Sequence, residues 1–190
     1  MKQTVVVMLK VPQAGRVKTR LGRDIGMVGS AWWFRHQVRR LLNRIEDPRW
    51  NVILAVAPDR TGMTTRVWPQ RFQRMPQGRG NLGDRMERAL RAPAIGPVCV
   101  IGGDIPDVNA DRIAEAFAAL GNHDAVFGPA VDGGYWLVGL KRSKAVPPSI
   151  FDGVRWSTEH ALSDTMATLP DHRIATVATL RDVDTVADLN

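Results

Sequence analysis

The chain has 190 residues, of which 44% are hydrophobic and 24% are charged, and its formal net charge at pH 7 is +7. This length predicts one domain over residues 1–190, with enough apolar residues for a core. The apolar runs are far shorter than the roughly 20 residues of a membrane-spanning helix, so no membrane span is expected. The first apolar run is also too short for a secretion signal, which favours a cytoplasmic protein. The single cysteine, Cys99, excludes an internal disulfide.

The charge is divided unevenly along the chain. Residues 1–95 carry 19 Lys and Arg against 6 Asp and Glu, whereas residues 96–190 carry 7 against 13. A uniformly basic protein would indicate nucleic-acid binding. A basic half joined to an acidic half instead favours a site that binds phosphate on one side and a metal ion on the other, so no nucleic-acid partner is expected. The alternative is that these charges only solvate the surface.

The first apolar run, Thr4–Leu9, predicts a buried strand, and the segment after it, residues 10–22, is rich in cations. A loop of this kind presents backbone amides and cationic side chains to a diphosphate. It is not a P-loop, because Lys18-Thr19 lacks a glycine immediately before it. An unrelated, solvated basic loop is the alternative. The candidate phosphate-binding residues of the loop are Lys10, Gly15, Arg16, Lys18 and Arg20.

Residues 30–45 show helical periodicity, with apolar residues three and four positions apart and arginines at 35, 39, 40 and 44 between them. A basic helix can bind nucleic acid or a membrane, but we favour a solvated helix face. Residues 51–57 predict a second buried strand. Residues 60–76 are harder to interpret, and we expect a short strand and a turn there.

The run Gly78–Gly83 has the spacing G-x-G-x-x-G. The dinucleotide-binding fingerprint requires a buried strand directly before these glycines, whereas residues 71–77 are polar and contain a proline. We therefore expect the glycines to form a flexible approach to a ligand rather than a nicotinamide or flavin site. A helix is expected from Asp84 to about Ala92, and its Arg85 is a further candidate phosphate ligand.

The run Val98–Ile101 predicts a strand buried on both faces, followed by two glycines and then by Asp104 and Asp107. Ligands of open parallel α/β sheets bind outside the carboxyl ends of the strands. Because divalent cations prefer oxygen ligands, Asp104 is a candidate metal ligand. The alternative is a plain turn in which Asp107 or Asn109 caps the following helix, expected over residues 110–120.

Two further strands are expected at residues 124–128 and 135–140, with Asp132-Gly133-Gly134 between them. Asp132 should lie at a strand edge and face the same space as Asp104. The alternative is a hairpin in which the Asp-Gly pair supplies only turn geometry.

Toward the end of the chain, Ser157 or Thr158 is expected to cap a helix over residues 159–169. After a last strand over residues 173–180, Asp182 and Asp184 should share one side of an extended segment. They could complete a metal site, or favour the N-terminus of a terminal helix.

In this order, the segments resemble a family of small bacterial GT-A-like glycosyltransferases. Asn81 stands where that family has Asp, Asp84 replaces Glu and Gly103 replaces Ser. The missing carboxylate at position 81 puts a metal or acceptor role there in doubt. The matching elements cover nearly the whole chain and are Lys10–Leu21, Gly80–Met86, Gly102–Val108, Gly128–Tyr135, Trp156–Thr158 and Asp182–Thr185.

The resemblance implies a single-domain, Rossmann-like GT-A fold of the α/β class, with a mostly parallel central sheet and helices on both faces. It also implies a nucleotide-diphosphate-sugar donor, a small-molecule acceptor, and Mg²⁺ or Mn²⁺. The opening loop and the closing Asp-x-Asp-Thr resemble small nucleotidyltransferases as well, such as the phospholactate guanylyltransferases, which release pyrophosphate. A non-catalytic, nucleotide-binding partner protein is the alternative outside enzymes.

Our mechanistic hypothesis gives the carboxylates two roles and one aromatic residue a third. Asp104, helped by Asp182 or Asp184, would hold the cation that neutralises charge on the leaving phosphate, which makes Asp104 catalytic as well. Asp132 would contact or deprotonate the acceptor hydroxyl. Trp156 could stack on a base or a sugar.

Overall fold

The computed structural model describes residues 2–143 and 145–189, and in this part of the chain seven strands form one sheet. The strands are β1 (Gln3–Lys10), β2 (Trp50–Ala57), β3 (Gln73–Pro76), β4 (Val98–Gly102), β5 (Ala125–Pro129), β6 (Tyr135–Leu140) and β7 (Ile174–Thr176). Their spatial order is β3-β2-β1-β4-β6-β5-β7. Only β6 runs antiparallel to its neighbours, β4 and β5, so the expected, mostly parallel sheet is confirmed.

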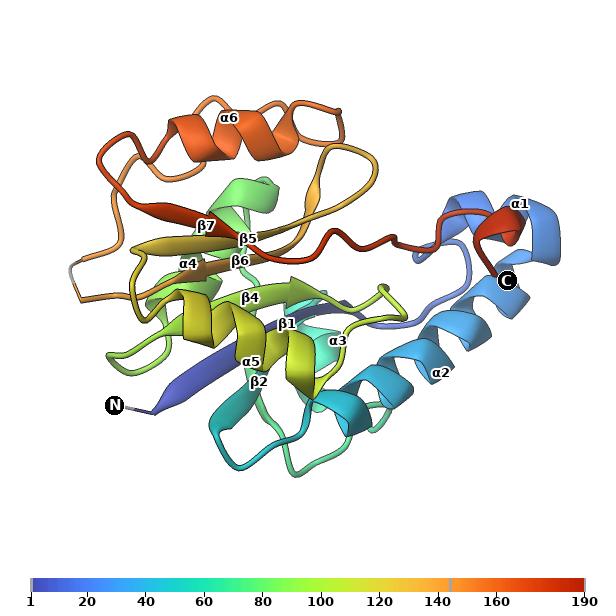
Figure 1. The fold of residues 1–190 in the computed structure, drawn as a ribbon. Coiled ribbons are helices and arrows are strands. Elements are labelled where there is room, and N and C mark those ends of the chain that lie inside the picture. Colours follow the sequence, from blue (N-terminus) through green and yellow to red (C-terminus); the bar gives the residue numbers. More distant parts are fainter. Residues whose placement is uncertain (1, 144, 190) are drawn as a thin grey trace.

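Helices lie on both faces of this sheet (Figure 1). They are α1 (Thr19–Ile25), α2 (Met27–Ile45), α3 (Asp59–Thr64), α4 (Leu82–Arg91), α5 (Ala110–Ala119), α6 (Ala161–Ala167) and a 3₁₀ helix, η1 (Val186–Leu189). Because side chains alternate along a strand, Val5 and Val7 of β1 pack with α2 and α5, whereas Val6 packs with α4 and α6. Among the described residues, no helix is long and apolar enough to cross a bilayer.

The middle of the sheet creates a place for a ligand. The chain leaves β1 through α1 and α2 to reach β2 on one side, and it comes from β3 through α4 to reach β4 on the other. The crevice outside the carboxyl ends of such neighbouring strands is where open α/β sheets bind ligands. A Cβ atom on Gly103 would lie 2.4 Å from Cδ2 of Leu9, so the glycine allows the ends of β1 and β4 to come together.

Two elements in the first half differ from the sequence-based expectation. Thr19–Gly22 was expected in a loop but forms the first turn of α1. The segment 60–76 contains α3 as well as the expected short strand, β3. A Cβ atom on Gly62 would lie 2.6 Å from Val56, so α3 packs closely on β2. Arg74 also donates hydrogen bonds to main-chain oxygens of this segment, including that of Thr65 at 2.7 Å. Tertiary contacts therefore hold a helix that has no apolar periodicity.

The surroundings of the G-x-G-x-x-G run also differ from expectation. A strand, β3, ends at Pro76 just before the glycines, but it lies at the edge of the sheet, where a polar strand ending in proline is tolerated. The helix α4 begins two residues earlier than expected. The Asn81 side chain accepts a hydrogen bond from the Asp84 amide at 3.0 Å, and the Asp84 carboxylate accepts one from the Asn81 amide at 2.7 Å. Asn81 is therefore the helix cap in a reciprocal capping box.

In the second half, neither Ser157 nor Thr158 caps α6, contrary to the prediction. The helix begins at Ala161, and His160 before it makes no side-chain capping bond. The Thr158 hydroxyl instead donates to the Arg155 carbonyl at 2.8 Å and accepts from the His160 amide at 3.2 Å, which stabilises a loop. The last strand, β7, is shorter than expected and ends at Thr176.

Candidate active site

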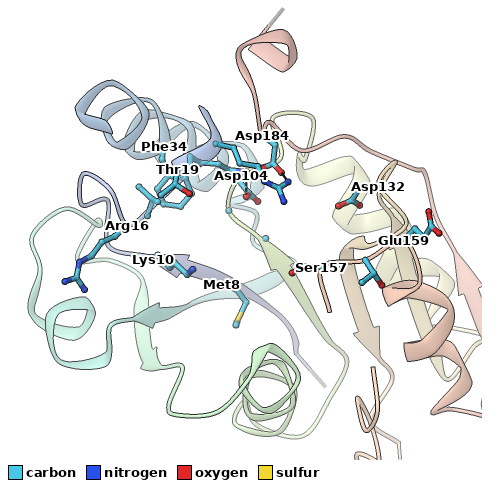
Figure 2. A pocket seen from close by; sticks show the side chains of 16 residues that line it. Met8, Lys10, Arg16, Thr19, Phe34, Asp104, Asp132, Ser157, Glu159 and Asp184 are labelled. Atoms are coloured by element: carbon cyan, nitrogen blue, oxygen red, sulfur yellow. Dashed lines mark hydrogen bonds and ion pairs between the residues drawn. The ribbon is translucent and has the colours of Figure 1, made fainter. Parts of the chain in front are cut away.

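A cleft of about 700 Å³ lies at the crevice between β1 and β4. Figure 2 shows Asp132, Ser157 and Glu159 on one side of it, and Lys10 and Arg16 on the other. The charged side chains that line the cleft come from the end of β1 and the segment after it, the loop after β4, the β5–β6 connection, the loop before α6 and the segment after β7. The predicted site residues that line this cleft are Lys10, Arg16, Lys18, Arg20, Asp104, Asp132 and Asp184.

Lys18 lies at the centre of the charged groups. It precedes α1 with a φ of 44°, a left-handed conformation that is uncommon for lysine, and its side chain is only 7% exposed. Its Nζ lies 2.6 Å from Asp104 Oδ2, 3.0 Å from Asp184 Oδ1 and 3.5 Å from Asp182 Oδ2. Burial by itself lowers the pKa of this ammonium, but the attraction of Asp104 and Asp184 outweighs burial and raises the pKa above its ordinary value.

The two C-terminal carboxylates share this lysine but differ in their electrostatics. Burial raises the pKa of Asp184, but hydrogen bonds from Lys18 and from Arg20, whose Nη1 lies at 2.8 Å, lower it overall. The pKa of Asp182 is raised, first by burial and then by the charges of other aspartates, and Lys18 offsets this rise only in part. The cluster therefore holds more negative charge than its lysine neutralises.

The donor chemistry of this cluster fits a hard divalent cation. Aspartate oxygens are the ligands that Mg²⁺ and Mn²⁺ prefer, and Asp104, Asp182 and Asp184 all face the same ammonium. Across residues 2–143 and 145–189, no three His, Cys, Asp or Glu side chains are already arranged as a metal site. The carboxylates are instead gathered around Lys18, whose ammonium supplies the positive charge they share.

Asp132 stands on the wall formed by the β5–β6 connection. Its Oδ1 accepts a hydrogen bond from the Gly134 amide at 2.9 Å, which fixes the turn. Gly133 has a φ of +84°, and a Cβ atom there would lie 2.3 Å from the Glu159 carbonyl oxygen. The Gly133 carbonyl also accepts a hydrogen bond from the Leu162 amide at 3.1 Å. The paired glycines therefore do more than shape a turn, because they let the loop before α6 pack against it.

Two smaller pockets adjoin the cleft and contain three of the remaining predicted residues. A pocket of about 490 Å³ shares Lys10 and Arg16 with the cleft and is also lined by Arg85. A pocket of about 240 Å³ shares Asp104 and Asp132 with the cleft. This second pocket is also lined by Asp182, Tyr135 and Trp156, and the Trp156 ring centroid lies 6.5 Å from that of Tyr135 and 5.9 Å from that of Phe151.

Gly15 does not line any of these three pockets, although the sequence placed it among the phosphate-binding candidates. Its φ of 74° shows that it shapes the loop after β1. Sequence reasoning missed Ser157 and Glu159, which line the cleft, because Trp-Ser-Thr was interpreted as a helix cap. The Trp156-Ser157-Thr158 motif was the signal in the sequence that could have directed attention to this segment. Met8, Thr19, Phe34 and Thr158 also line the cleft without having been predicted.

The fold and the cleft define an open α/β protein with a charged cleft at the switch point of its sheet. The particular family follows from the sequence: residues 41–158 match the family described as "Uncharacterized protein conserved in bacteria (DUF2064)", and the chain belongs to it. No protein with a curated description matches the chain significantly.

Solved structures share this fold over the whole chain. A candidate nucleotide-diphospho-sugar transferase from Desulfovibrio desulfuricans G20 is 28% identical with a TM-score of 0.86, covering 100% of this chain and 85% of its own. CMP:2-keto-3-deoxy-manno-octonic acid synthetase in complex with CTP is 12% identical with a TM-score of 0.59, covering 100% and 95%. Rv0371c of Mycobacterium tuberculosis H37Rv in complex with manganese is 16% identical with a TM-score of 0.54, covering 100% and 96%. At these low identities, the last two show the fold alone.

Proposed function

We propose that residues 1–190 form a single GT-A domain that transfers a sugar from a nucleotide-diphosphate donor to a small-molecule acceptor in a metal-dependent reaction. One observation carries this proposal: cations from the loop after β1 and carboxylates from later segments line one cleft of about 700 Å³. That volume is in the range of pockets for ligands of this size. The resemblance in fold to the Desulfovibrio protein described above supports the same class of donor.

The cationic side of the cleft would bind the diphosphate. Among the described residues, neither Lys10 nor Arg16 is paired with an acidic side chain, so both are available to phosphate oxygens. Lys18 is already held by carboxylates, and it can bind phosphate only by exchanging one of them. Arg20 is 70% exposed and bonds to Asp184 on one side only, which leaves donors for the ligand. Arg85 would reach the nucleotide from the 490 Å³ pocket.

The acidic side would hold the cation. Asp104, Asp182 and Asp184 are the residues that would bind Mg²⁺ or Mn²⁺. When bound, such a cation neutralises the charge that develops on the leaving nucleoside diphosphate. Lys18 and Arg20 keep Asp184 directed into the cleft through hydrogen bonds of 3.0 and 2.8 Å, so this ligand is positioned in advance.

The acceptor would approach through the 240 Å³ pocket. Asp132 lines both this pocket and the main cleft, so its carboxylate would contact the acceptor hydroxyl and take its proton. Tyr135 and Trp156 offer aromatic surface in the same pocket, and such surface suits the apolar face of a sugar ring.

A nucleotidyltransferase that releases pyrophosphate is the second candidate. The 490 Å³ pocket favours it, because Arg79 and Arg85 extend the cationic wall beyond Lys10 and Arg16 and could receive a triphosphate. The synthetase complexed with CTP has a similar fold. A non-catalytic role has less support, because two of the departures from the family pattern have structural reasons: Asn81 caps α4, and Gly103 lets β1 and β4 approach each other.

The products distinguish these functions. We would incubate the protein with Mn²⁺ and each common nucleotide-sugar, and measure release of the nucleoside diphosphate. We expect slow release without acceptor that requires the cation and falls on the order of 100-fold in Asp104→Asn. Pyrophosphate release from a nucleoside triphosphate, without turnover of any nucleotide-sugar, would establish the second candidate instead. No turnover of either substrate class would contradict both.

A further inference from the structure

The outward face of α2 is a charged surface that the proposed function leaves unexplained. The helix buries Phe34, Val38 and Leu41 in the core and exposes the opposite face. Residues 25–45 contain no Asp or Glu. Four arginines of α2 are exposed, and they are Arg35, Arg39, Arg40 and Arg44.

These arginines lack the acidic partners that several other surface arginines have. Within residues 2–143 and 145–189, none of the four α2 arginines forms an ion pair, and neither does Arg23 of α1. By contrast, Arg49, Arg71 and Arg155 each lie 2.8 Å from a carboxylate oxygen of a neighbouring acidic residue. The positive charge of α2 is therefore uncompensated within the described chain.

Exposed apolar side chains gather at the start of the same face. Val28 is 75% exposed and Trp32 is 64% exposed, and the two lie one helical turn apart. Ile25 beside them, at the end of α1, is 38% exposed. The Trp32 ring packs on that of His36 with centroids 4.0 Å apart, so the indole is held at the surface in an ordered position.

We propose that this face, comprising Ile25, Val28, Trp32 and the arginines of α2, binds the surface of an anionic lipid bilayer. Helices that lie on membranes combine Trp and aliphatic residues with Lys and Arg on one exposed side. The apolar residues would enter the boundary between headgroups and acyl chains, and the arginines would bind lipid phosphates.

Other occupants account for only part of this face. A solvated helix, which the sequence favoured, explains the arginines but not the apolar cluster. A nucleic acid would use the arginines and leave Val28 and Ile25 without contacts. A second copy would bring arginines together on a face whose helix carries no acidic residue to receive them. An anionic bilayer offers acyl chains for the apolar residues at the start of α2 and phosphates for its arginines.

The helix α1, next to the start of this face, borders the cleft. Thr19 and Arg20 at the start of α1 line the cleft, and α1 contacts both α2 and η1. Figure 1 shows α1, the first turns of α2 and η1 together at one end of the molecule. Docking through this face would therefore hold the mouth of the cleft near lipid headgroups.

Vesicle sedimentation tests the proposal with the full-length protein. We expect binding to vesicles of equal phosphatidylcholine and phosphatidylglycerol, and much weaker binding to phosphatidylcholine alone. Arg35→Gln/Arg39→Gln should lower the partition coefficient by about fivefold for each arginine removed. The matched control, Arg60→Gln/Arg66→Gln, removes two exposed, unpaired arginines at and just after α3, and should leave binding within twofold of the original protein.

A second pair of variants, one test and one control, measures the apolar contribution to vesicle binding. Trp32→Ser should weaken binding to the anionic vesicles roughly tenfold. Ile95→Ser, at a residue that is 74% exposed far along the chain from α2, should leave it unchanged. Circular dichroism would confirm that all four variants remain folded.

Three results would overturn the proposal. The first is a negative vesicle experiment: either the original protein does not bind anionic vesicles, or the test and control variants lose the same amount of vesicle binding. The second is salt-dependent retention of duplex DNA that the arginine variant abolishes and Trp32→Ser leaves intact, without vesicle binding. The third is a concentration-dependent dimer in sedimentation velocity that Trp32→Ser dissociates, which would assign this face to a second copy.

Discussion

The two walls of the cleft are built in different ways. The cationic wall comes from one continuous segment, residues 10–20, which runs from the last residue of β1 to the first turn of α1. The acidic wall is assembled from separate segments, which follow β4, join β5 to β6, precede α6 and follow β7. Lys18 joins the two walls through its contacts with Asp104, Asp182 and Asp184. The acidic wall therefore depends on packing between distant segments, whereas the cationic wall depends mainly on its own side chains.

The strongest test of the link between the walls is Lys18→Met. It removes the buried ammonium and leaves three carboxylates, each 30–37% exposed, facing one another. Breaking a fully buried ion pair costs about 3–5 kcal/mol, and because these carboxylates are partly exposed we expect a loss of about 2–3 kcal/mol. Urea denaturation measures it. Arg49→Met, which removes an exposed ion pair with Asp47, is the control and should change stability far less. Equal losses would show that Lys18 does not hold the two walls together.

The packing of the acidic wall is tested by Gly133→Ala. The new Cβ would collide with the Glu159 backbone, and alanine is strained at a φ of +84°. We expect a loss of about 2 kcal/mol or more and weaker nucleotide binding, because Asp132 and residues 157–159 would move apart.

Gly153→Ala is the matched control, because Gly153 has a φ of +69° but no atom within 4 Å of the added Cβ. It should cost about 1 kcal/mol from backbone strain alone and leave binding unchanged. If both variants behave alike in stability and in binding, the contact between Gly133 and Glu159 does not hold the wall together.

Beside the cleft, Asn81→Ala should cost about 1 kcal/mol, because α4 loses the side chain that accepts from the Asp84 amide. Asn81→Ser retains a capping oxygen and should be nearly neutral in thermal denaturation. Since Asn81 serves as a cap, neither variant should alter the Mn²⁺ dependence of nucleotide binding. A changed Mn²⁺ requirement in either one would place Asn81 in the metal site.

The smallest effect concerns Asp182, whose pKa is raised by burial and by the neighbouring carboxylates. A carboxyl with a higher pKa in the folded state binds its proton more tightly there, so its ionisation destabilises the fold as pH rises through that pKa. Asp182→Asn should therefore stabilise the protein at pH 7 by up to about 1 kcal/mol. The gain should vanish as pH falls below the ordinary aspartate pKa. Urea denaturation at pH 7 and pH 3.5 would detect this, and a loss at pH 7 would contradict it.

Much of this architecture could be predicted from sequence, because buried strands and their flanking residues are local signals. The strands β1, β2, β4, β5 and β6 are marked by apolar runs, and Asp104 and Asp132 follow or precede such runs directly. The prediction that Asp182 and Asp184 face one side is confirmed, since both approach Lys18.

The features that could not be predicted from the sequence depend on contacts between distant segments. The short helix α3 is held by Arg74 and by close packing on β2, neither of which has a periodic signature. Ser157 and Glu159 reach the cleft because Gly133 admits the loop before α6, a contact across 26 residues. The start of α1 was missed because its turn begins inside a loop rich in cations.

Calorimetry of nucleoside diphosphate binding tests the central claim most directly, namely that both walls act on one ligand. Each common nucleoside diphosphate would be titrated with and without Mn²⁺ into the original protein, Arg16→Ala and Asp104→Asn. We predict binding of at least one diphosphate that requires Mn²⁺, is weakened in Arg16→Ala and loses its Mn²⁺ dependence in Asp104→Asn. Unchanged, Mn²⁺-dependent binding in Asp104→Asn would contradict the account.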